Sequence, residues 1–195
     1  MRHITTQICA SRFSQVFFAG RSDALRDLVV ELGERNCNPN FPITVVTGTD
    51  ASTLTLSSGD EIDQQFAAAV RDAQVTVLFT GHAHPDQWRD RQADDAQPFN
   101  QFRDRFNEEF PDSALDDGQA MMAHDAVAAA VQAIRDGGEA GGNLWLSMHG
   151  PNRLNGVTGP IDLDDFGNTI DKPVPILRIE PDGSRSFVRM SNPRQ

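Results

Sequence analysis

The sequence contains no tyrosine and only one lysine, Lys172, so almost all of its positive charge comes from arginine. Basic residues are also scarce, since 17 of them stand against 28 aspartates and glutamates, and the formal net charge at pH 7 is -11. A phosphate backbone requires a basic surface, so this charge balance excludes a nucleic-acid partner. It favours a small molecule or a protein as the partner.

Long apolar runs are missing as well. No run reaches the length of about 18 residues that a membrane span needs, so no segment is predicted to insert into a membrane. The first 20 residues lack the basic start and apolar middle of a signal peptide. At 195 residues with 38% hydrophobic content, the chain is long enough for one domain, or one and a half, with a buried core.

Recognisable catalytic motifs are absent too. The sequence has no G-x-S-x-G, P-loop or G-x-G-x-x-G motif. His82, His84 and Asp86 do follow an apolar strand with the H-x-H-x-D spacing of metallo-β-lactamase-like hydrolases, which bind zinc. Gln87 stands where that motif has a further histidine, so a polar hinge is favoured over a metal site. We predict no enzymatic activity, metal or cofactor, and keep a metal-dependent hydrolase as an alternative.

Apolar runs alternate with helical patterns in the first 80 residues. Strands are predicted at 15–20, 43–46 and 75–79, and helices begin near Ser22 and near Asp60. This β-α-β order predicts a parallel sheet with right-handed crossovers. The apolar residues expected on the inner faces of the two helices are Leu25, Leu28, Val29, Leu32, Ile62, Phe66, Ala69 and Val70.

The middle of the chain is different in character. Residues 81–97 are polar and lack hydrophobic periodicity, so they are predicted to be a connector. Helices are expected at 98–110, at about 116–135 and, as a short one, at 143–148. The spacing of Phe99, Phe102, Phe106 and Phe110 predicts a core stripe. The longer helix carries the apolar residues Met121, Met122, Val127, Val131 and Ile134.

The segment 154–183 predicts a compact C-terminal β unit. Gly156 and Gly159 permit tight turns around a short strand, and a second apolar strand follows near Ile176. The turn at 181–183 then leads into a third strand, predicted at 186–190.

Four segments in this order resemble the type I periplasmic binding protein family, the extracytoplasmic receptors of branched-chain amino acid and amide uptake systems. They are QVFFAGRSDALRDLVVEL, VTVLFTGHAHPDQW, FNQFRDRFNEEFPDSALDDGQAMMAHDAVAAAVQAIR and NGVTGPI. The resemblance covers nearly the whole chain. His124 departs from it, because an aromatic residue, often tyrosine, is usual at that position.

The resemblance implies an α/β, type I periplasmic-binding-protein-like fold: a parallel sheet flanked by helices, with C-terminal closing strands. It identifies the chain as the C-terminal half of a two-lobed receptor, so the architecture is incomplete and an export signal would lie before Met1. The implied divisions are 1–80 as the β-α-β portion of the second lobe, 81–97 as an inter-lobe connector, 98–150 as helices of the first lobe, and 151–195 as the C-terminal β unit.

Candidate ligand-binding residues follow two of the predicted strands, because ligands of open parallel sheets bind beyond the carboxyl ends of the strands. They are Arg21, Ser22 and Asp23 after the first strand, and Thr49 and Asp50 after the second. The first loop matches the family position from which an acid reaches a ligand ammonium, whereas an arginine suits a carboxylate. The alternative is that Ser22 and Asp23 only cap a helix.

The function that the resemblance implies is that of a solute-binding protein of an ABC-type uptake system. Such a protein binds a small polar ligand, such as an amino acid or amide, in an inter-lobe cleft and passes it to a membrane permease. The expected location is periplasmic or cell-surface, with a lipid anchor on a missing N-terminal part as one option. In an exported protein Cys9 and Cys37 are expected to form a disulfide, and in a cytosolic one to be buried thiols. A ligand-sensing domain of a larger regulator is the alternative.

Overall fold

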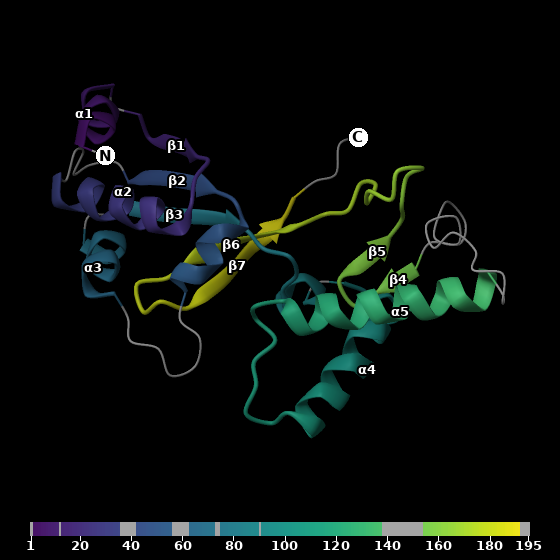
Figure 1. Ribbon diagram of the computed structural model, residues 1–195. Coiled ribbons are helices and arrows are strands. Elements are labelled where there is room, and N and C mark those ends of the chain that lie inside the picture. The colour runs from purple at the N-terminus through teal and green to yellow at the C-terminus, as the bar shows by residue number, and fades with distance from the viewer. Residues whose placement is uncertain are drawn as a thin grey trace. The chain divides into compact units, whose positions relative to one another are not determined.

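The computed structural model describes residues 2–11, 13–35, 42–55, 63–72, 75–89, 91–137 and 154–191. The chain divides into two compact units (Figure 1). Unit 1 consists of Met1–Gly81 and Ile176–Arg189, and unit 2 consists of His82–Pro175 and Met190–Gln195. The backbone therefore passes from one unit to the other at three points along the sequence.

A five-stranded sheet forms the centre of unit 1, with the order β1-β2-β3-β6-β7. The first three strands are parallel, and β6 runs antiparallel to β3. A turn at Gly183, which has a φ of 81°, joins β6 to β7. The fold class expected from the sequence, a mostly parallel sheet flanked by helices, is confirmed. The strands are β1 (Gln15–Phe18), β2 (Ile43–Thr47), β3 (Val75–Thr80), β6 (Pro175–Ile179) and β7 (Arg185–Met190).

The helices of unit 1 are α1 (Arg2–Ser11), α2 (Ser22–Arg35) and α3 (Gln64–Asp72), with a short 3-10 helix η1 (Thr49–Leu54) after β2. The core lies between the sheet and α2 and α3, where Val45 and Val77 are fully buried side by side. The predicted inner face of α2 is confirmed, and Phe66 and Ala69 of α3 are buried as expected. Ile62 lies outside the described residues.

The opposite face of the sheet carries an apolar row that is partly open to solvent. Phe17, Val46 and Leu78 follow one another in register across β1, β2 and β3, and the charged Arg178 of β6 follows Leu78. Phe17 is 77% exposed and Val46 is 37% exposed. Successive side chains of a strand point to opposite faces, so the same strands that build the core also present this row.

In its described residues, unit 2 contains two long helices and a separate two-stranded sheet. The described elements are η2 (Pro85–Trp88), α4 (Ala93–Glu109), α5 (Gln119–Gly137), β4 (Leu154–Gly156) and β5 (Gly159–Ile161). The strands β4 and β5 pair with each other, whereas β6 and β7 belong to the sheet of unit 1. The four strands of the C-terminal segment are thus divided between two sheets. No helix in the described part of the chain combines the length and apolar character needed to span a bilayer.

Two features of the helices were not predicted. The helix expected at 98–110 begins at Ala93, inside the stretch 81–97 that was predicted to be a connector, and this stretch also contains η2. Asp94 and Asp95 favour a helix N-terminus through the helix dipole, yet polar residues give no hydrophobic period from which to predict the helix. The helix α1 was not predicted either, since it buries only Thr5 and Ile8. The short helix expected at 143–148 lies outside the described residues.

The apolar residues of α5 do not mark its buried face. Met121 is buried, but four other apolar residues are exposed: Met122, Val127, Val131 and Ile134. The buried positions instead recur every four residues, at Met121, Asp125, Ala129 and Ala133.

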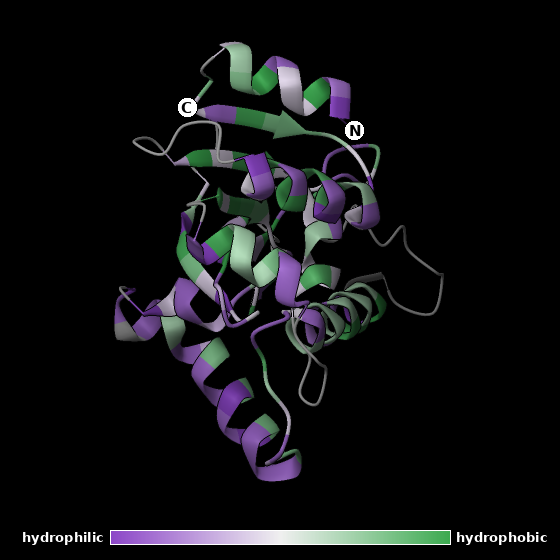
Figure 2. Cartoon of the chain, turned by 90° about the vertical axis from the view of Figure 1, so that its left-hand side faces the viewer, coloured by the Kyte–Doolittle hydropathy of each residue, from purple (hydrophilic) through white to green (hydrophobic). Residues whose placement is uncertain are grey.

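The phenylalanines of α4 are buried only in part. Phe99 lies in the core of unit 2, whereas Phe110 is 51% exposed at the far end of the helix. Figure 2 shows that α4, the lowest helix in that view, is hydrophilic over most of its length.

Matched substitutions in β2 test the assignment of the two sheet faces. Val45→Ala should lower the free energy of unfolding by about 2 kcal/mol, because it leaves a cavity in the core. Val46→Ala removes the same atoms from the open face and should cost less than about 0.5 kcal/mol. Urea denaturation of both variants measures the difference, and equal losses would contradict the assignment.

Candidate functional site

The strands β1 and β2 bring the predicted binding residues to one edge of the sheet. Phe18 and Thr47, the last residues of these parallel strands, are register partners, so the loops that follow leave from the same edge. One loop carries the first group of predicted residues, 21–23, and the other leads into 49–50. No hydrogen bond or ion pair joins the two loops within the described residues.

In the first loop, Arg21 and Asp23 are open to solvent. Their side chains are 86% and 77% exposed, and the Nε of Arg21 lies 3.8 Å from the Oδ1 of Asp23. That oxygen also accepts a hydrogen bond of 2.9 Å from the backbone N–H of Ala24. Ala24 lies in the first turn of α2, which begins at Ser22. Asp23 therefore complements the helix N-terminus, and the guanidinium of Arg21 stays accessible to an anionic group.

In the second loop, Gly48 precedes the 3-10 helix η1, whose first turn holds Thr49 and Asp50. No described residue donates a hydrogen bond to the exposed carboxylate of Asp50. A Cβ atom at Gly48 would meet nothing within 4 Å, so this loop borders open space. The sheet edge thus presents an acid and an arginine on separate loops, a combination that can bind the two charges of a zwitterion.

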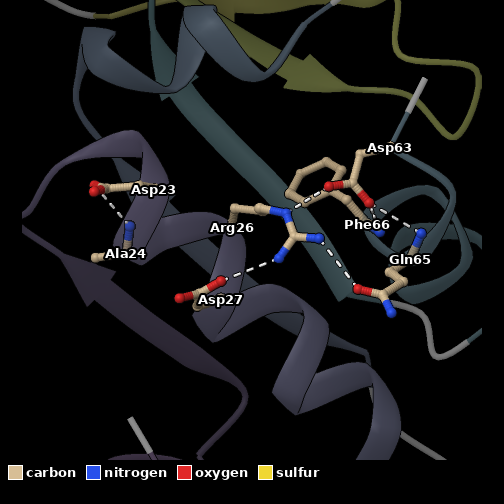
Figure 3. A network of polar contacts seen from close by, with 7 residues as sticks. All are labelled: Asp23, Ala24, Arg26, Asp27, Asp63, Gln65 and Phe66. Atoms are coloured by element: carbon tan, nitrogen blue, oxygen red, sulfur yellow. Dashed lines mark hydrogen bonds and ion pairs between the residues drawn. The ribbon is translucent and has the colours of Figure 1, made fainter. Parts of the chain in front are cut away.

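Close to this edge, Arg26 connects α2 to the start of α3 (Figure 3). Its Nε donates to Asp63 at 2.5 Å, and its other nitrogens donate to Gln65 and Asp27. Asp63 also accepts the backbone N–H groups of Gln65 and Phe66 and so caps α3. The hydrogen bond from Arg26 lowers the pKa of Asp63, although burial opposes this effect. These contacts hold the starts of α2 and α3 together, and they were not predicted from the sequence, in which α3 was expected to begin near Asp60.

The ion pair between Arg26 and Asp63 should make stability depend on pH. Because the pKa of Asp63 is lowered from 3.8, its contribution is complete above that value and is lost as the pH falls through the lower folded pKa. Asp63→Asn should lower the free energy of unfolding by less than about 1 kcal/mol at neutral pH, because asparagine is also a good helix cap and because solvent screens the ion pair that is lost.

Urea denaturation as a function of pH tests this prediction. The deficit of Asp63→Asn should shrink below about pH 4, whereas the exposed control Asp165→Asn should show none at any pH. A deficit of Asp63→Asn that stays constant down to about pH 2 would contradict the role of the charge.

In unit 2, one buried carboxylate holds the turn between β4 and β5. The oxygens of Asp125 on α5 accept the backbone N–H groups of Val157 and Thr158, each at 2.8 Å, and the Thr158 hydroxyl at 2.5 Å. Asp125 is 3% exposed. A Cβ atom at Gly156 would lie 2.3 Å from a carboxylate oxygen, so only glycine permits this approach.

Lys172, the single lysine, extends this network. Its Nζ donates a 2.6 Å hydrogen bond to the hydroxyl oxygen of Thr158, which in turn donates to Asp125. Burial lowers the pKa of Lys172, and the nearby charge of Asp125 partly offsets that effect. The network fixes the segment after β5 and explains the NGVTG pattern as a packing requirement. None of these residues was predicted as functional.

A glycine pair tests this packing. Gly156→Ala should lower the free energy of unfolding by about 2 to 4 kcal/mol, because the carboxylate of Asp125 must move and give up hydrogen bonds. Gly48→Ala adds the same methyl group where the space is open and φ is -84°, so the change should stay within about 0.5 kcal/mol. Denaturation curves compare the two, and a neutral Gly156→Ala would contradict the contact.

Of the two histidines after β3, His84 serves local structure. The Nδ1 of His84 accepts a hydrogen bond from the backbone N–H of Asp86, and Gln87 accepts from the backbone of His84, which together cap η2. His84 is buried, whereas His82 is exposed. Across the described ranges no group of three or more histidines, cysteines or acids could hold a metal ion. The role that the structure shows for His84 is to cap η2.

Of the two cysteines, Cys9 lies among the described residues. Cys9, on α1, is disulfide-bonded. Cys37 lies outside the described residues.

Comparison with known proteins gives a match in structure. No known family model matches the chain, and no curated protein matches it. A leucine-binding protein, LivK from Thermotoga maritima, aligns with a TM-score of 0.64 at 18% identity, over 98% of this chain and 48% of that one. An ABC transporter substrate-binding protein from Desulfitobacterium hafniense, in complex with leucine, aligns with a TM-score of 0.63 at 14% identity, over 95% and 47%.

These alignments show a shared fold. The chain spans about half the length of both solved structures.

Proposed function

We propose that this chain forms the C-terminal half of a type I periplasmic binding protein, a receptor that binds a small polar ligand for an ABC-type uptake system. The observation that carries the proposal is the alignment over 98% of the chain with a leucine-binding protein. The agreement runs through both units and the segments that join them, so it involves much more than a common β-α-β motif.

Exposed apolar surfaces support the proposal that this chain is one half of a receptor. Sheets with parallel strands are normally buried on both faces, yet Phe17 and Val46 are exposed on the open face of unit 1. In unit 2, Val127 and Ile134 of α5 are 65% and 71% exposed. The aligned structures are about twice as long as this chain, so a remaining half of the same fold supplies enough chain to cover both surfaces. The three passages between the units are in keeping with lobes joined by crossing segments.

The edge of the sheet in unit 1 supports an amino acid or amide as the ligand. Asp50 and, on the other loop, Asp23 offer carboxylates for an ammonium group, and Arg21 offers a guanidinium for a carboxylate. Thr49 and Ser22 add short hydroxyl groups at the same edge. Both aligned proteins carry leucine in their descriptions, which makes leucine the first probe.

An extracytoplasmic location follows from the same proposal. Disulfides persist in oxidising compartments, and Cys9 is disulfide-bonded. The partner is then a membrane permease that receives the ligand-bound receptor. A cytoplasmic sensor domain is less well supported, because reducing conditions would break this bond.

Isothermal titration calorimetry of the purified protein with L-leucine, the other standard amino acids and their amides tests this function. Asp50→Asn should lower the affinity for the bound compound at least about tenfold, because a charge-assisted hydrogen bond to its ammonium group is lost. Asp72→Asn is the matched control, since Asp72 is an exposed acid of unit 1 far along the chain from both loops, and it should leave the affinity unchanged. Equal affinities of the two variants, or no binding of any amino acid or amide, would overturn the proposal.

A further inference from the structure

Unit 2 contains a cavity of about 510 Å³ that is separate from the sheet edge of unit 1. Gln87, Trp88 and Asp95 line it from η2 and the start of α4, and Asn155, Thr158 and Asp171 line it from the β4–β5 hairpin and the segment beyond. Its volume lies within the range of small-molecule sites, about 300 to 1,000 Å³. The cavity can therefore hold a small organic molecule.

A fixed aromatic ring forms one wall. The indole Nε1 of Trp88 donates to the carbonyl oxygen of Val157 at 2.8 Å. The ring also stacks on Phe99, with centroids 6.0 Å apart and an interplanar angle of 13°. These two contacts hold the indole in one orientation, so it presents a rigid apolar surface to the cavity.

A buried amide provides a hydrogen-bond donor. Gln87 is only 8% exposed, and its Oε1 accepts from the backbone N–H of His84 at 3.3 Å. Its Nε2 group has no acceptor among the described residues. The protein does not enclose this atom completely. Gln87 is one of the residues that line the cavity. An amide donor that has no protein acceptor can donate to a ligand bound there.

The charged groups around the cavity are mostly acidic. Asp94, Asp95 and Asp171 line it, and Arg91 is the basic residue among its lining. No ion pair joins any of these four in the part of the chain that the structure describes. Three carboxylates against one guanidinium favour a positively charged ligand.

We propose that this cavity binds a small organic amine that carries a neutral carbonyl oxygen. The ammonium group lies against the carboxylates of Asp171 and Asp95, the carbonyl oxygen accepts from the Nε2 of Gln87, and the apolar part packs on Trp88. The inference uses residues of unit 2 only, so it does not depend on the ligand site proposed for unit 1.

Three related compounds test this ligand class. L-Leucinamide carries both groups, 4-methylpentanamide lacks the ammonium group, and isopentylamine lacks the carbonyl. The chain has two tryptophans, so its ¹H–¹⁵N spectrum shows two indole signals, and Trp88→Phe identifies the one from the cavity. That signal should shift saturably with L-leucinamide, which should bind about tenfold more tightly than either other compound.

Two variants separate the contributing groups. Asp171→Asn should weaken L-leucinamide binding about three- to tenfold and leave 4-methylpentanamide unaffected. Asp171 has a φ of 46°, which asparagine adopts readily, so the backbone is retained. Gln87→Glu keeps the oxygen that accepts from His84 but loses the donor, so the preference for L-leucinamide over isopentylamine should disappear.

A matched control makes the test decisive. Asp165→Asn removes the same charge from an exposed residue outside the cavity, so the Trp88 signal of this variant should respond to L-leucinamide as in the parent protein. The proposal is overturned if the Trp88 signal does not shift saturably at concentrations up to about 10 mM. It is also overturned if Asp171→Asn and Asp165→Asn have equal effects, or if all three compounds bind equally.

Discussion

The common register of the three parallel strands is the constraint on which unit 1 depends. Parallel strands can be joined only by crossovers, so α2 and α3 return along the sheet and bury one of its faces. The same register brings the ends of β1 and β2 to one edge, which places Arg21 and Asp50 on neighbouring loops. It also aligns Phe17 and Val46 on the face that the described helices leave open. The register of these strands thus determines the positions of the core, of the candidate site and of the exposed apolar surface.

Unit 2 has no such sheet and depends on a buried carboxylate instead. Asp125 satisfies the backbone of the turn between β4 and β5, and Gly156 lets α5 come close enough for it to do so. The sequence segments HDAV and NGVTG therefore contact each other through Asp125. An unpaired buried carboxylate would be unfavourable, so the turn and the helix support each other. Lys172 attaches the following segment to the same network.

The success of sequence patterns differed between the two units for a physical reason. The stripe of α2 was predicted correctly because the sheet and helix that cover it belong to the same unit and leave a single apolar face to bury. In α5 the apolar pattern does not show which face is buried, since Val127 and Val131 are exposed and the polar Asp125, which faces the turn, is buried in their place. Periodicity counts apolar residues, whereas burial depends on which surfaces are present to cover them. The start of α4 was missed for a related reason, as its first turn is polar.

The sequence by itself determined the strands and most helices of unit 1, the parallel order of its sheet, and the two loops that carry Arg21 and Asp50. These features depend on residues a few positions apart or on the alternation of strands and helices along the chain. Only the tertiary structure decided that Arg26 binds Asp63, that Asp125 holds Thr158, and that Gln87 lines a cavity. Each of these features depends on contacts between segments that lie far apart in the sequence. The strength of such contacts comes from the exclusion of water and from satisfied hydrogen bonds, and no local sequence pattern predicts them.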